Sequence, residues 1–248
     1  MIVTPIKTPI VKQNDNLFKI IKKSIPQLAE ESILVVTSKI ISFSQGRIVK
    51  RTTKDQSEKH QLVKKEADDY LEPHSSRYKV MLTIKNNTLA VNAGIDESNA
   101  DDGYVLWPED LQKTTNDIWR FLRENYQVKK VGVIVTDSKT LPLRWGVVGT
   151  AIAHCGFQAL YDYRGAKDLF GREIRMSQIN IAEAIAVAAV LEMGEVAERT
   201  PLCLVKEMKK IKFQNRPSTP KELASLRIRP EDDVYAPLLT SVQWKKGL

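Results

Sequence analysis

Unbroken runs of apolar, mostly β-branched residues recur along the chain and predict strands that are buried on both faces. The clearest run is 131–135 (VGVIV), and the runs 33–37 (ILVVT) and 201–205 (PLCLV) are similar. Runs of about four to eight such residues between polar segments are typical of strands in the middle of a covered sheet. We expect residues 39–42 to continue the 33–37 strand, as a bent strand or hairpin, up to the turn at Gln45-Gly46.

A second hairpin is predicted where two strand-like segments flank a polar turn. Residues 79–84 (KVMLTI) and 88–91 (TLAV) lie on either side of Lys85-Asn86-Asn87. Asparagine readily adopts the backbone conformations of tight turns. The second strand leads directly into Asn92-Ala93-Gly94 and then Asp96, so this carboxylate is expected to follow a strand through a glycine turn.

Four segments have apolar residues at helical spacing, and they predict helices between the strands. They cover residues 17–24, 57–71, 111–122 and 177–193. The last segment is apolar almost all round its circumference, so we expect it in the core, with Ser177 as its N-terminal cap and Gly194 at its end.

The domain organisation is expected to be simple. The sequence has no internal repeat and no linker long enough to force a division. We expect one domain over residues 1–206, which can consist of two subdomains, followed by an extension over 207–248 that is basic at first and then interrupted by prolines. A chain of 248 residues with 42% hydrophobic and 27% charged residues can bury a large core, and this composition excludes wholesale disorder.

The charge and the cysteine content indicate which partners and which cellular compartment to expect. The net charge of +8, from 38 Lys and Arg against 30 Asp and Glu, favours anionic partners such as phosphates or nucleic acid. Cys155 and Cys203 lie in apolar stretches, which favours buried thiols in a reducing cytoplasm over a disulfide. The longest apolar run, 184–191, is far shorter than the roughly 20 residues of a membrane span, and residues 1–12 do not resemble a secretory signal. We therefore expect a cytoplasmic protein that does not enter a membrane.

Several familiar nucleotide and metal motifs are absent from the sequence. It has no phosphate-binding loop of the G-x-x-x-x-G-K-[ST] type, no G-x-G-x-x-G fingerprint after a strand and no Cys/His pair with zinc spacing. A nucleotide site in this chain must therefore be unconventional. The three histidines, His60, His74 and His154, lie in unrelated contexts, and we expect none of them to be catalytic.

Two carboxylates are stronger candidates for a functional site than the histidines. Asp96 follows a glycine turn and Asp137 ends the 131–135 strand, and ligands of open sheets gather beyond the carboxyl ends of strands. With the hydroxyl of Ser138 they form a partial cage for a hard cation such as Mg²⁺. On spacing alone, the alternative that both acids merely cap turns is equally good. For Arg144 two interpretations are open. Its guanidinium donates two hydrogen bonds to a phosphate or carboxylate, or it forms a surface ion pair.

Five segments stand out as ordered motifs. They are VNAGIDESN (91–99), VGVIVTDS (131–138), LRWGVVGTAIAHCGF (143–157), DYRGAKDLFGREI (162–174) and LEMGE (191–195). Together they resemble the γ-glutamyl ligase family typified by coenzyme F-420-0:L-glutamate ligase. The segments TPIVKQND (8–15) and VVTSKIISFSQGR (35–47) resemble the N-terminal part of that family, and the resemblance extends to about residue 206.

The resemblance implies a reaction, a fold and an assembly. The family forms an amide between L-glutamate and a cofactor carboxylate, using GTP, a divalent cation (Mg²⁺ or Mn²⁺) and preferably K⁺. It therefore implies a ligase with GTP, or ATP, as co-substrate. It also implies an α/β fold of the mixed α+β kind, a γ-glutamyl ligase-like fold that is neither P-loop nor Rossmann. The assembly that it implies is an intertwined homodimer with the nucleotide near the dimer junction.

Functional residues follow from the resemblance, motif by motif. The metal positions fall on Asp96, Asp137, Ser138 and Glu195. The nucleotide-contacting positions fall on Thr8, Pro9, Ile10, Val11, Ser38, Lys39, Asn99, Met193 and Gly194. We expect Asp137 and Arg144 to act in catalysis. We expect Lys39 and Arg144 to bind phosphate or carboxylate oxygens of the substrates.

Three departures from the family pattern concern the substrates. Lys139-Thr140-Leu141 stands where the family has a glycine and an arginine, Phe43 replaces a nucleotide-contacting lysine, and Ala182 precedes Glu183 where an Asp-Glu pair is usual. They leave two acceptors open, coenzyme F-420-0, a deazaflavin, and as the alternative a folate. A family member that has lost its activity is a further interpretation.

A function of another class also has to be considered. The net charge and the basic residues between 206 and 216 would suit a non-enzymatic module that binds nucleic acid or another anionic partner. Aromatic residues make up only 7% of the chain, and none is interleaved regularly with that cluster, so stacking platforms for bases are not evident. Nucleic acid is therefore not expected as the partner.

Overall fold

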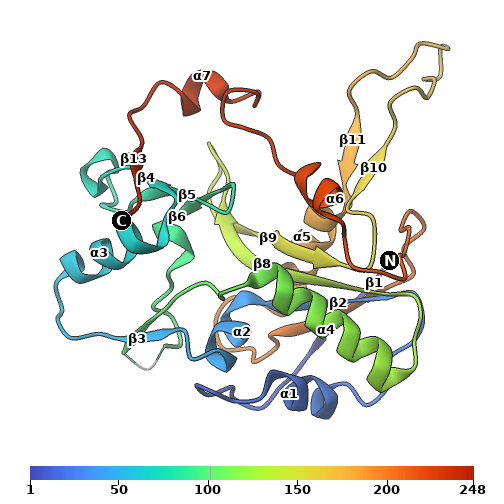
Figure 1. The fold of residues 1–248 in the computed structure, drawn as a ribbon, viewed down its shortest axis with the longest axis horizontal. Coiled ribbons are helices and arrows are strands. Elements are labelled where there is room, and N and C mark those ends of the chain that lie inside the picture. The colour runs from blue at the N-terminus through green and yellow to red at the C-terminus, as the bar shows by residue number, and fades with distance from the viewer. Residues whose placement is uncertain (101) are drawn as a thin grey trace.

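A five-stranded mixed sheet forms the centre of the molecule (Figure 1). The computed structural model describes residues 1–100 and 102–248. The strand order is β1 (Ile2–Ile6), β12 (Leu202–Lys206), β2 (Ser32–Thr37), β8 (Val131–Thr140) and β9 (Val147–Cys155). Only the β2–β8 pair is parallel, and the other neighbours in this sheet run antiparallel.

Both faces of this sheet are covered, as the unbroken apolar runs predict. In β2, Leu34 and Val36 pack into one cluster, which includes residues of α4 (Leu111–Tyr126) and α1 (Leu17–Ser24). Ile33 and Val35 point the other way, into a cluster with α5 (Ile181–Met193). Successive side chains of a strand alternate between faces, so a strand between two helical layers has to be apolar at every position.

A smaller antiparallel sheet lies beside the main one. Its order is β13 (Lys245–Lys246), β4 (Asp69–Tyr70), β5 (Leu82–Lys85) and β6 (Thr88–Val91). Helix α3 (Gln56–Glu66) contributes Val63 to the core of this part, and β3 (Ile48–Lys50) pairs with β7 (Gly103–Val105). Because β13 pairs with β4, the C-terminal end of the chain returns to this sheet (Figure 1).

Two further parts extend from the body. Strands β10 (Leu160–Asp162) and β11 (Gln178–Asn180) pair at the base of a long hairpin arm that projects from the molecule (Figure 1). The C-terminal segment contains two short helices, α6 (Pro220–Ala224) and α7 (Ala236–Leu239), on its way back to β13. Short 3₁₀ turns occur at Pro73–Ser75 and Asn92–Gly94.

Most of the predicted elements are confirmed. The mixed α/β class is correct, as are the strands at 33–37, 131–135 and 201–205 and the hairpin of β5 and β6. The helices over 17–24 and 111–122 are present, and the second continues to Tyr126. The N-terminal strand β1 has no counterpart among the predictions.

The prediction of a bent strand at residues 39–42 is wrong. The chain leaves β2 at Thr37 and forms helix α2 (Ser38–Ser44) at once. Ile40 and Ile41 turn into the same core cluster as α1, and the hydroxyl of Ser42 donates to the carbonyl of Ser38, 3.1 Å away. β-branched residues favour strands only weakly, and here tertiary packing overrides that preference.

Two predicted helix limits also need correction. The helix predicted over 57–71 ends at Glu66, because Asp69–Tyr70 joins the small sheet as β4. The last helix starts at Ile181, and its cap is Asn180, whose side chain accepts from the amide of Glu183. Ser177 instead precedes β11. Every helix among the described residues is too short or too polar to span a bilayer.

Helix α5 is buried on one side only. Ile185 and Ala189 lie in the core as expected, but Leu191 is 79% exposed. A helix that is apolar all round and covered on one side presents an apolar strip to its surroundings. Cys155 and Cys203 are both buried free thiols, as expected in place of a disulfide.

His154 joins the main sheet to the C-terminal segment. It lies on β9, it is 3% exposed, and its Nε2 is 3.1 Å from the hydroxyl of Ser218. Burial lowers its pKa to about 4, although the nearby carboxylate of Glu222 acts in the opposite direction. The folded protein therefore holds His154 neutral in a pH range where an unfolded chain protonates histidine.

We predict that this histidine makes the protein acid-sensitive. Between pH 6.5 and pH 4 the unfolded state binds the extra proton, so the free energy of unfolding falls as the pH falls, by up to about 3 kcal/mol from this group. The difference in stability between wild type and His154→Gln, measured by urea unfolding at several pH values, should shrink by that amount over this range. Gln61→Asn, at an exposed position without a titratable group, is the control and should give a constant difference. An equally constant difference for His154→Gln would contradict the assignment.

Candidate functional site

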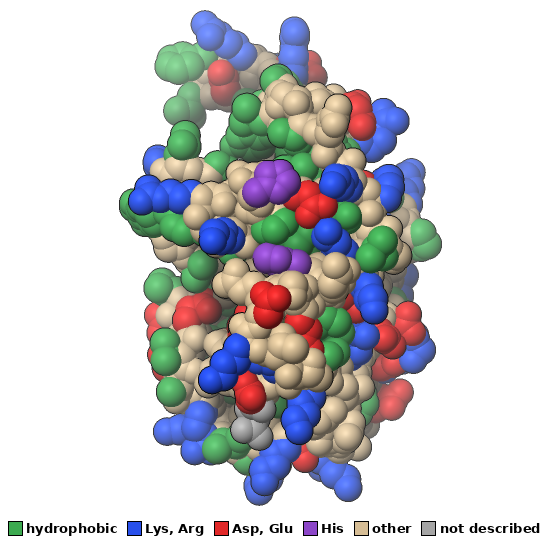
Figure 2. Space-filling view, turned by 90° about the vertical axis from the view of Figure 1, so that its left-hand side faces the viewer, with side chains coloured by type: hydrophobic (Ala, Val, Ile, Leu, Met, Phe, Trp, Pro, Cys, Tyr) green, Lys and Arg blue, Asp and Glu red, His purple; other side chains and the backbone are tan. Residues whose placement is uncertain are grey.

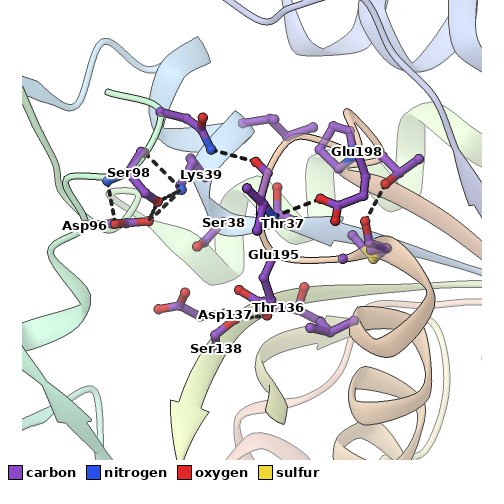
Figure 3. Close-up of a pocket in the computed structure, with 18 of the residues that line it drawn as sticks. Thr37, Ser38, Lys39, Asp96, Ser98, Thr136, Asp137, Ser138, Glu195 and Glu198 are labelled. Atoms are coloured by element: carbon purple, nitrogen blue, oxygen red, sulfur yellow. Dashed lines mark hydrogen bonds and ion pairs between the residues drawn. The ribbon is translucent and has the colours of Figure 1, made fainter. Parts of the chain in front are cut away.

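A cavity of about 780 Å³ opens at the edge of the main sheet where β2 ends. Five segments line it: 8–11 after β1, 37–40 at the start of α2, the stretch from 91 to 99, residues 136–138 of β8, and the end of α5 with the loop as far as 201. Figure 3 shows that these segments direct polar side chains into one space. The cavity therefore lies between the main sheet and the small one.

The parallel pairing of β2 and β8 explains why the cavity forms here. Thr37, the last residue of β2, lies opposite Thr136 of β8. Beyond this pair the chain of β2 turns into α2, whereas β8 continues along β9, which bulges at Ile152 opposite Val135 and Thr136. The sheet therefore loses a strand at this level, and Asp137 borders the opening. The sequence predicted Asp137 at the end of its strand, but Asp137 lies within β8. It does lie just beyond the carboxyl end of the neighbouring strand β2.

A strained turn brings Asp96 to the opposite side of the cavity. Asn92, Ala93 and Gly94 have φ values of 53°, 52° and 72°, in the left-handed region. Such a conformation suits asparagine and glycine but disfavours alanine. It is held by the amide of Met81, which donates to Asn92 Oδ1 over 2.9 Å.

Asp96 is held by a lysine and a serine. Lys39 Nζ lies 2.5 Å from Asp96 Oδ2 and 2.8 Å from Ser98 Oγ, and the amide of Ser98 donates to Asp96 Oδ1 over 2.8 Å (Figure 3). Burial alone would raise the pKa of Asp96, but the hydrogen bonds from Lys39 and Ser98 outweigh it and lower the pKa below its ordinary value. Asp96 is therefore a stable carboxylate with its charge balanced by Lys39.

Asp137 lies in a different environment. Burial raises its pKa to about 6, partly offset by a hydrogen bond from the indole of Trp107, and the charge of Asp96 adds to the increase. The Trp107 Nε1 atom donates to Asp137 Oδ2 over 2.5 Å. A carboxylate that is buried near a second carboxylate favours the approach of a cation.

The loop after α5 closes the third side. The hydroxyl of Ser138 donates to Glu195 Oε1 over 2.6 Å, which ties this loop to β8 (Figure 3). The side-chain amide of Asn99 donates to the carbonyl of Val196 over 3.0 Å, and the backbone amide of Thr8 donates to the carbonyl of Arg199 over 2.9 Å. The loop is thus fixed to every wall of the cavity.

The structure brings nearly all predicted site residues together. All four predicted metal positions and all nine predicted nucleotide positions line this one cavity: Thr8, Pro9, Ile10, Val11, Ser38, Lys39, Asp96, Asn99, Asp137, Ser138, Met193, Gly194 and Glu195. Arg144 is not among the lining residues. It lies in the exposed turn between β8 and β9, where its guanidinium donates to the carbonyl of Leu143. Its role in catalysis stays a prediction.

Several residues of the site were not predicted. Ser98 could have been found, because a serine two residues after an aspartate is typical of a turn in which the carboxylate accepts from the chain. Glu198 and Arg199 lie in a loop without periodic pattern. Trp107 precedes a proline outside every predicted element, so no local pattern links it to Asp137.

The residues present suit a hard divalent cation. Carboxylate and hydroxyl oxygens are the ligands of Mg²⁺ and Mn²⁺, and Mg²⁺ commonly uses one or two carboxylates together with substrate phosphates. The lining holds four carboxylates, on Asp96, Asp137, Glu195 and Glu198, against the two cations Lys39 and Arg199. Over residues 1–100 and 102–248, no three His, Cys, Asp or Glu side chains form a ready-made metal cluster. The donor set therefore fits a cation that is shared with a substrate.

The fold and the site together define a mixed α/β protein with a cavity that four carboxylates line. The sequence pattern of the family described as F420-0:Gamma-glutamyl ligase matches residues 5–207. The chain belongs to this family.

Named relatives agree with this assignment. The chain is 32% identical over 215 residues to the coenzyme F420:L-glutamate ligase of Methanopyrus kandleri, which covers 80% of this chain and 83% of the relative. It is 30% identical over 249 residues to the protein of that name from Methanococcus maripaludis strain C6. That alignment covers 95% of this chain and 97% of the relative. The protein of that name from Archaeoglobus fulgidus is 32% identical over 213 residues, and the alignment covers 80% of this chain and 84% of the relative.

We predict that Gly94 is required for the arrangement around Asp137. A Cβ atom at this position would lie 1.9 Å from Trp107 Nε1, and the residue has a positive φ. Gly94→Ala should therefore cost roughly 2–5 kcal/mol of stability, from backbone strain plus displacement of the indole. Gly146→Ala is the matched control, because φ is +89° there and nothing lies within 4 Å of the added Cβ. Thermal melts should show a much smaller loss for the control, and equal losses would contradict the contact with Trp107.

Proposed function

We propose that the protein is an NTP-dependent and divalent-metal-dependent γ-glutamyl ligase that joins L-glutamate to a carboxylate of a coenzyme F420 precursor. The observation that carries this proposal is the convergence, in one acidic cavity, of the thirteen residues to which the family resemblance assigns metal and nucleotide contacts. The names of the relatives supply the reaction class. GTP is the preferred nucleotide in this proposal, with ATP as the alternative, and K⁺ is an additional cofactor.

The chemistry needs activation of a carboxylate. A free carboxylate is a poor acyl donor, so one of its oxygens attacks the γ-phosphorus of the nucleotide and the bond to the β-phosphate oxygen breaks. This gives an acyl phosphate and a nucleoside diphosphate. The amine of glutamate then attacks the acyl carbon, loses a proton, and displaces inorganic phosphate. No side chain has to form a covalent intermediate.

The residues of the cavity have distinct tasks in this reaction. Asp96, Asp137, Ser138 and Glu195 would hold the divalent cation, which supplies neutralisation of charge on the transferring phosphoryl group. Lys39 binds phosphate or carboxylate oxygens once it exchanges its partner Asp96 for a substrate oxygen. The segment 8–11 and the end of α5 enclose the nucleotide.

The acceptor proposed here is coenzyme F-420-0 and not a folate. The relatives are named for coenzyme F420, which does not favour the folate alternative.

A nucleic-acid-binding module has less support. Figure 2 views the side of the molecule that lies at the left of Figure 1, and on this face basic and acidic side chains are interspersed. Lys64, Lys245 and Lys246 in this part are all paired with carboxylates. In the basic segment, Arg216 is paired with Glu222, and Lys210 and Lys212 lie over the rings of Tyr163 and Tyr161. Lys206 and Lys209 form no ion pair with the described residues. A groove that binds the backbone of a nucleic acid needs Lys and Arg side chains that are free to pair with phosphates.

The assembly proposed is an intertwined homodimer outside the P-loop and Rossmann classes. Large apolar side chains stay exposed at two projecting hairpins: Leu143 and Trp145 between β8 and β9, and Leu169 and Phe170 in the arm beyond β10. Exposed apolar groups of this size mark interaction surfaces. We infer that a second copy covers them and that Arg144, at the same turn, reaches the cavity of its partner.

The other proposals concern the domain limits and the compartment. Residues 1–206 form the catalytic domain, and 207–248 form an extension that packs on β9 through Ser218 and on β4 through β13. The two free thiols support a reducing, cytoplasmic location.

We predict that sedimentation equilibrium gives about twice the chain mass of 28.1 kDa. Trp145→Ser should produce a monomer without lowering the stability of the single chain, because Trp145 is 94% exposed. Tyr78→Ser, which also removes an exposed aromatic ring, is the control and should leave the dimer intact. A wild-type protein that sediments as a fully active monomer would rule out the dimer.

The function is tested by incorporation of labelled glutamate. Wild type should add glutamate to F-420-0 with GTP and Mn²⁺ or Mg²⁺, and not to a folate offered at equal concentration. Asp137→Asn should lose at least about 1,000-fold in turnover while it stays folded, because it removes a charge from the cation site. Asp117→Asn, on the outer face of α4 between Lys113 and Arg120, should remain active. Incorporation into folate alone, or full activity of Asp137→Asn, would overturn the corresponding part of the proposal.

A further inference from the structure

Asp137 is held by a tryptophan that lies outside the cavity. Trp107 is 4% exposed, lies between β7 and α4, and donates its indole N–H to Asp137 Oδ2 over 2.5 Å. It is not one of the residues that line the cavity. A group in this position cannot touch a substrate, but it determines where one oxygen of the carboxylate lies.

The ring of Trp107 is itself fixed on several sides. The backbone of Gly94 packs so closely on it that no side chain fits between them. Lys85 Nζ lies 5.8 Å from the ring centroid, within the range of a cation–π contact, and Arg47 Nε donates to the carbonyl of Trp107 over 3.2 Å. The indole therefore has one available orientation.

Lys85 and Arg47 are joined by the same carboxylate. Glu66 Oε2 lies 2.5 Å from Lys85 Nζ, and Glu66 Oε1 lies 2.7 Å from Arg47 Nη2. All three side chains are largely shielded from solvent, so the pairs are weakly screened. Through these contacts the small sheet and α3 hold Trp107 in place.

The chemistry of the indole suits this task. Its N–H can only donate, so it cannot exchange roles with the carboxylate, as a hydroxyl or an imidazole can. A bond from an N–H to an ionised oxygen is stronger and shorter than one between neutral groups. The bond occupies Oδ2 and leaves Oδ1 for other partners.

We propose that Trp107 is a positioning residue for Asp137, which fixes this carboxylate for the cation and substrate of the active site. The inference rests on the proposed function, since it assigns Asp137 to that site. It adds that the small sheet controls the geometry of an acid on the main sheet. Asp96 is held by different partners, Lys39 and Ser98.

A closely matched control exists within the same chain. Trp119 is also 4% exposed, its indole donates to a backbone carbonyl, that of Val131, over 2.9 Å, and Gly156 packs on it as Gly94 does on Trp107. Removing either indole N–H costs a buried hydrogen bond. Only Trp107 donates to a carboxylate of the cavity.

The test compares Trp107→Phe with Trp119→Phe. Groups that orient a metal ligand typically contribute 10- to 100-fold in metal affinity or activity. Trp107→Phe should therefore lose about 10- to 100-fold in Mn²⁺ affinity or in kcat, while Trp119→Phe stays within about twofold of wild type. In an Asp137→Asn background, Trp107→Phe should cause no further loss of Mn²⁺ affinity. An active wild type with an equally active Trp107→Phe would overturn the inference, whereas an inactive wild type that binds no Mn²⁺ would overturn the proposed function and the inference with it.

A spectroscopic measurement on the wild-type chain covers the case in which Trp107→Phe does not fold. The ¹⁵N-indole resonance of Trp107, assigned through its proximity to Gly94, should broaden in Mn²⁺ at concentrations that leave the Trp119 resonance sharp. It should also shift in Asp137→Asn, with Trp119 again unchanged. A Trp107 resonance that responds to neither change would refute the positioning role.

Discussion

The parallel pairing of β2 with β8 is the interaction on which the rest of the structure depends. Its ladder runs from Ser32 with Val131 to Thr37 with Thr136, and then the two chains diverge. One chain becomes α2 and presents Lys39, and the other continues as β8 and presents Asp137. A slip of one residue would move Asp137 to the opposite face of the sheet, so this register determines whether the site exists.

The second constraint is charge. The chain has a net charge of +8, but four carboxylates and only two cationic side chains line its large cavity. A nucleoside triphosphate is repelled from such a cavity unless cations enter with it. In the proposed function, cations that enter with the nucleotide would offset this excess of acidic groups.

The sequence predicted the central strands because their burial on both faces leaves an unbroken apolar signal, as in residues 131–135. It failed at residues 39–42, where packing of Ile40 and Ile41 decides the conformation and no local preference does. The site positions were found through motif resemblance, and the fold then placed them around one cavity. Contacts such as that of Trp107 with Asp137 join residues 30 positions apart through no periodic pattern, so only the folded structure could reveal them.

Anomalous diffraction from crystals grown with Mn²⁺ and a non-hydrolysable GTP analogue tests the central claim most directly. The account predicts a manganese peak at the carboxylate of Asp137, phosphate density beside it, and Lys39 moved from Asp96 onto a phosphate oxygen. Manganese and nucleotide bound elsewhere, with the Lys39–Asp96 pair intact and the cavity unchanged, would contradict it.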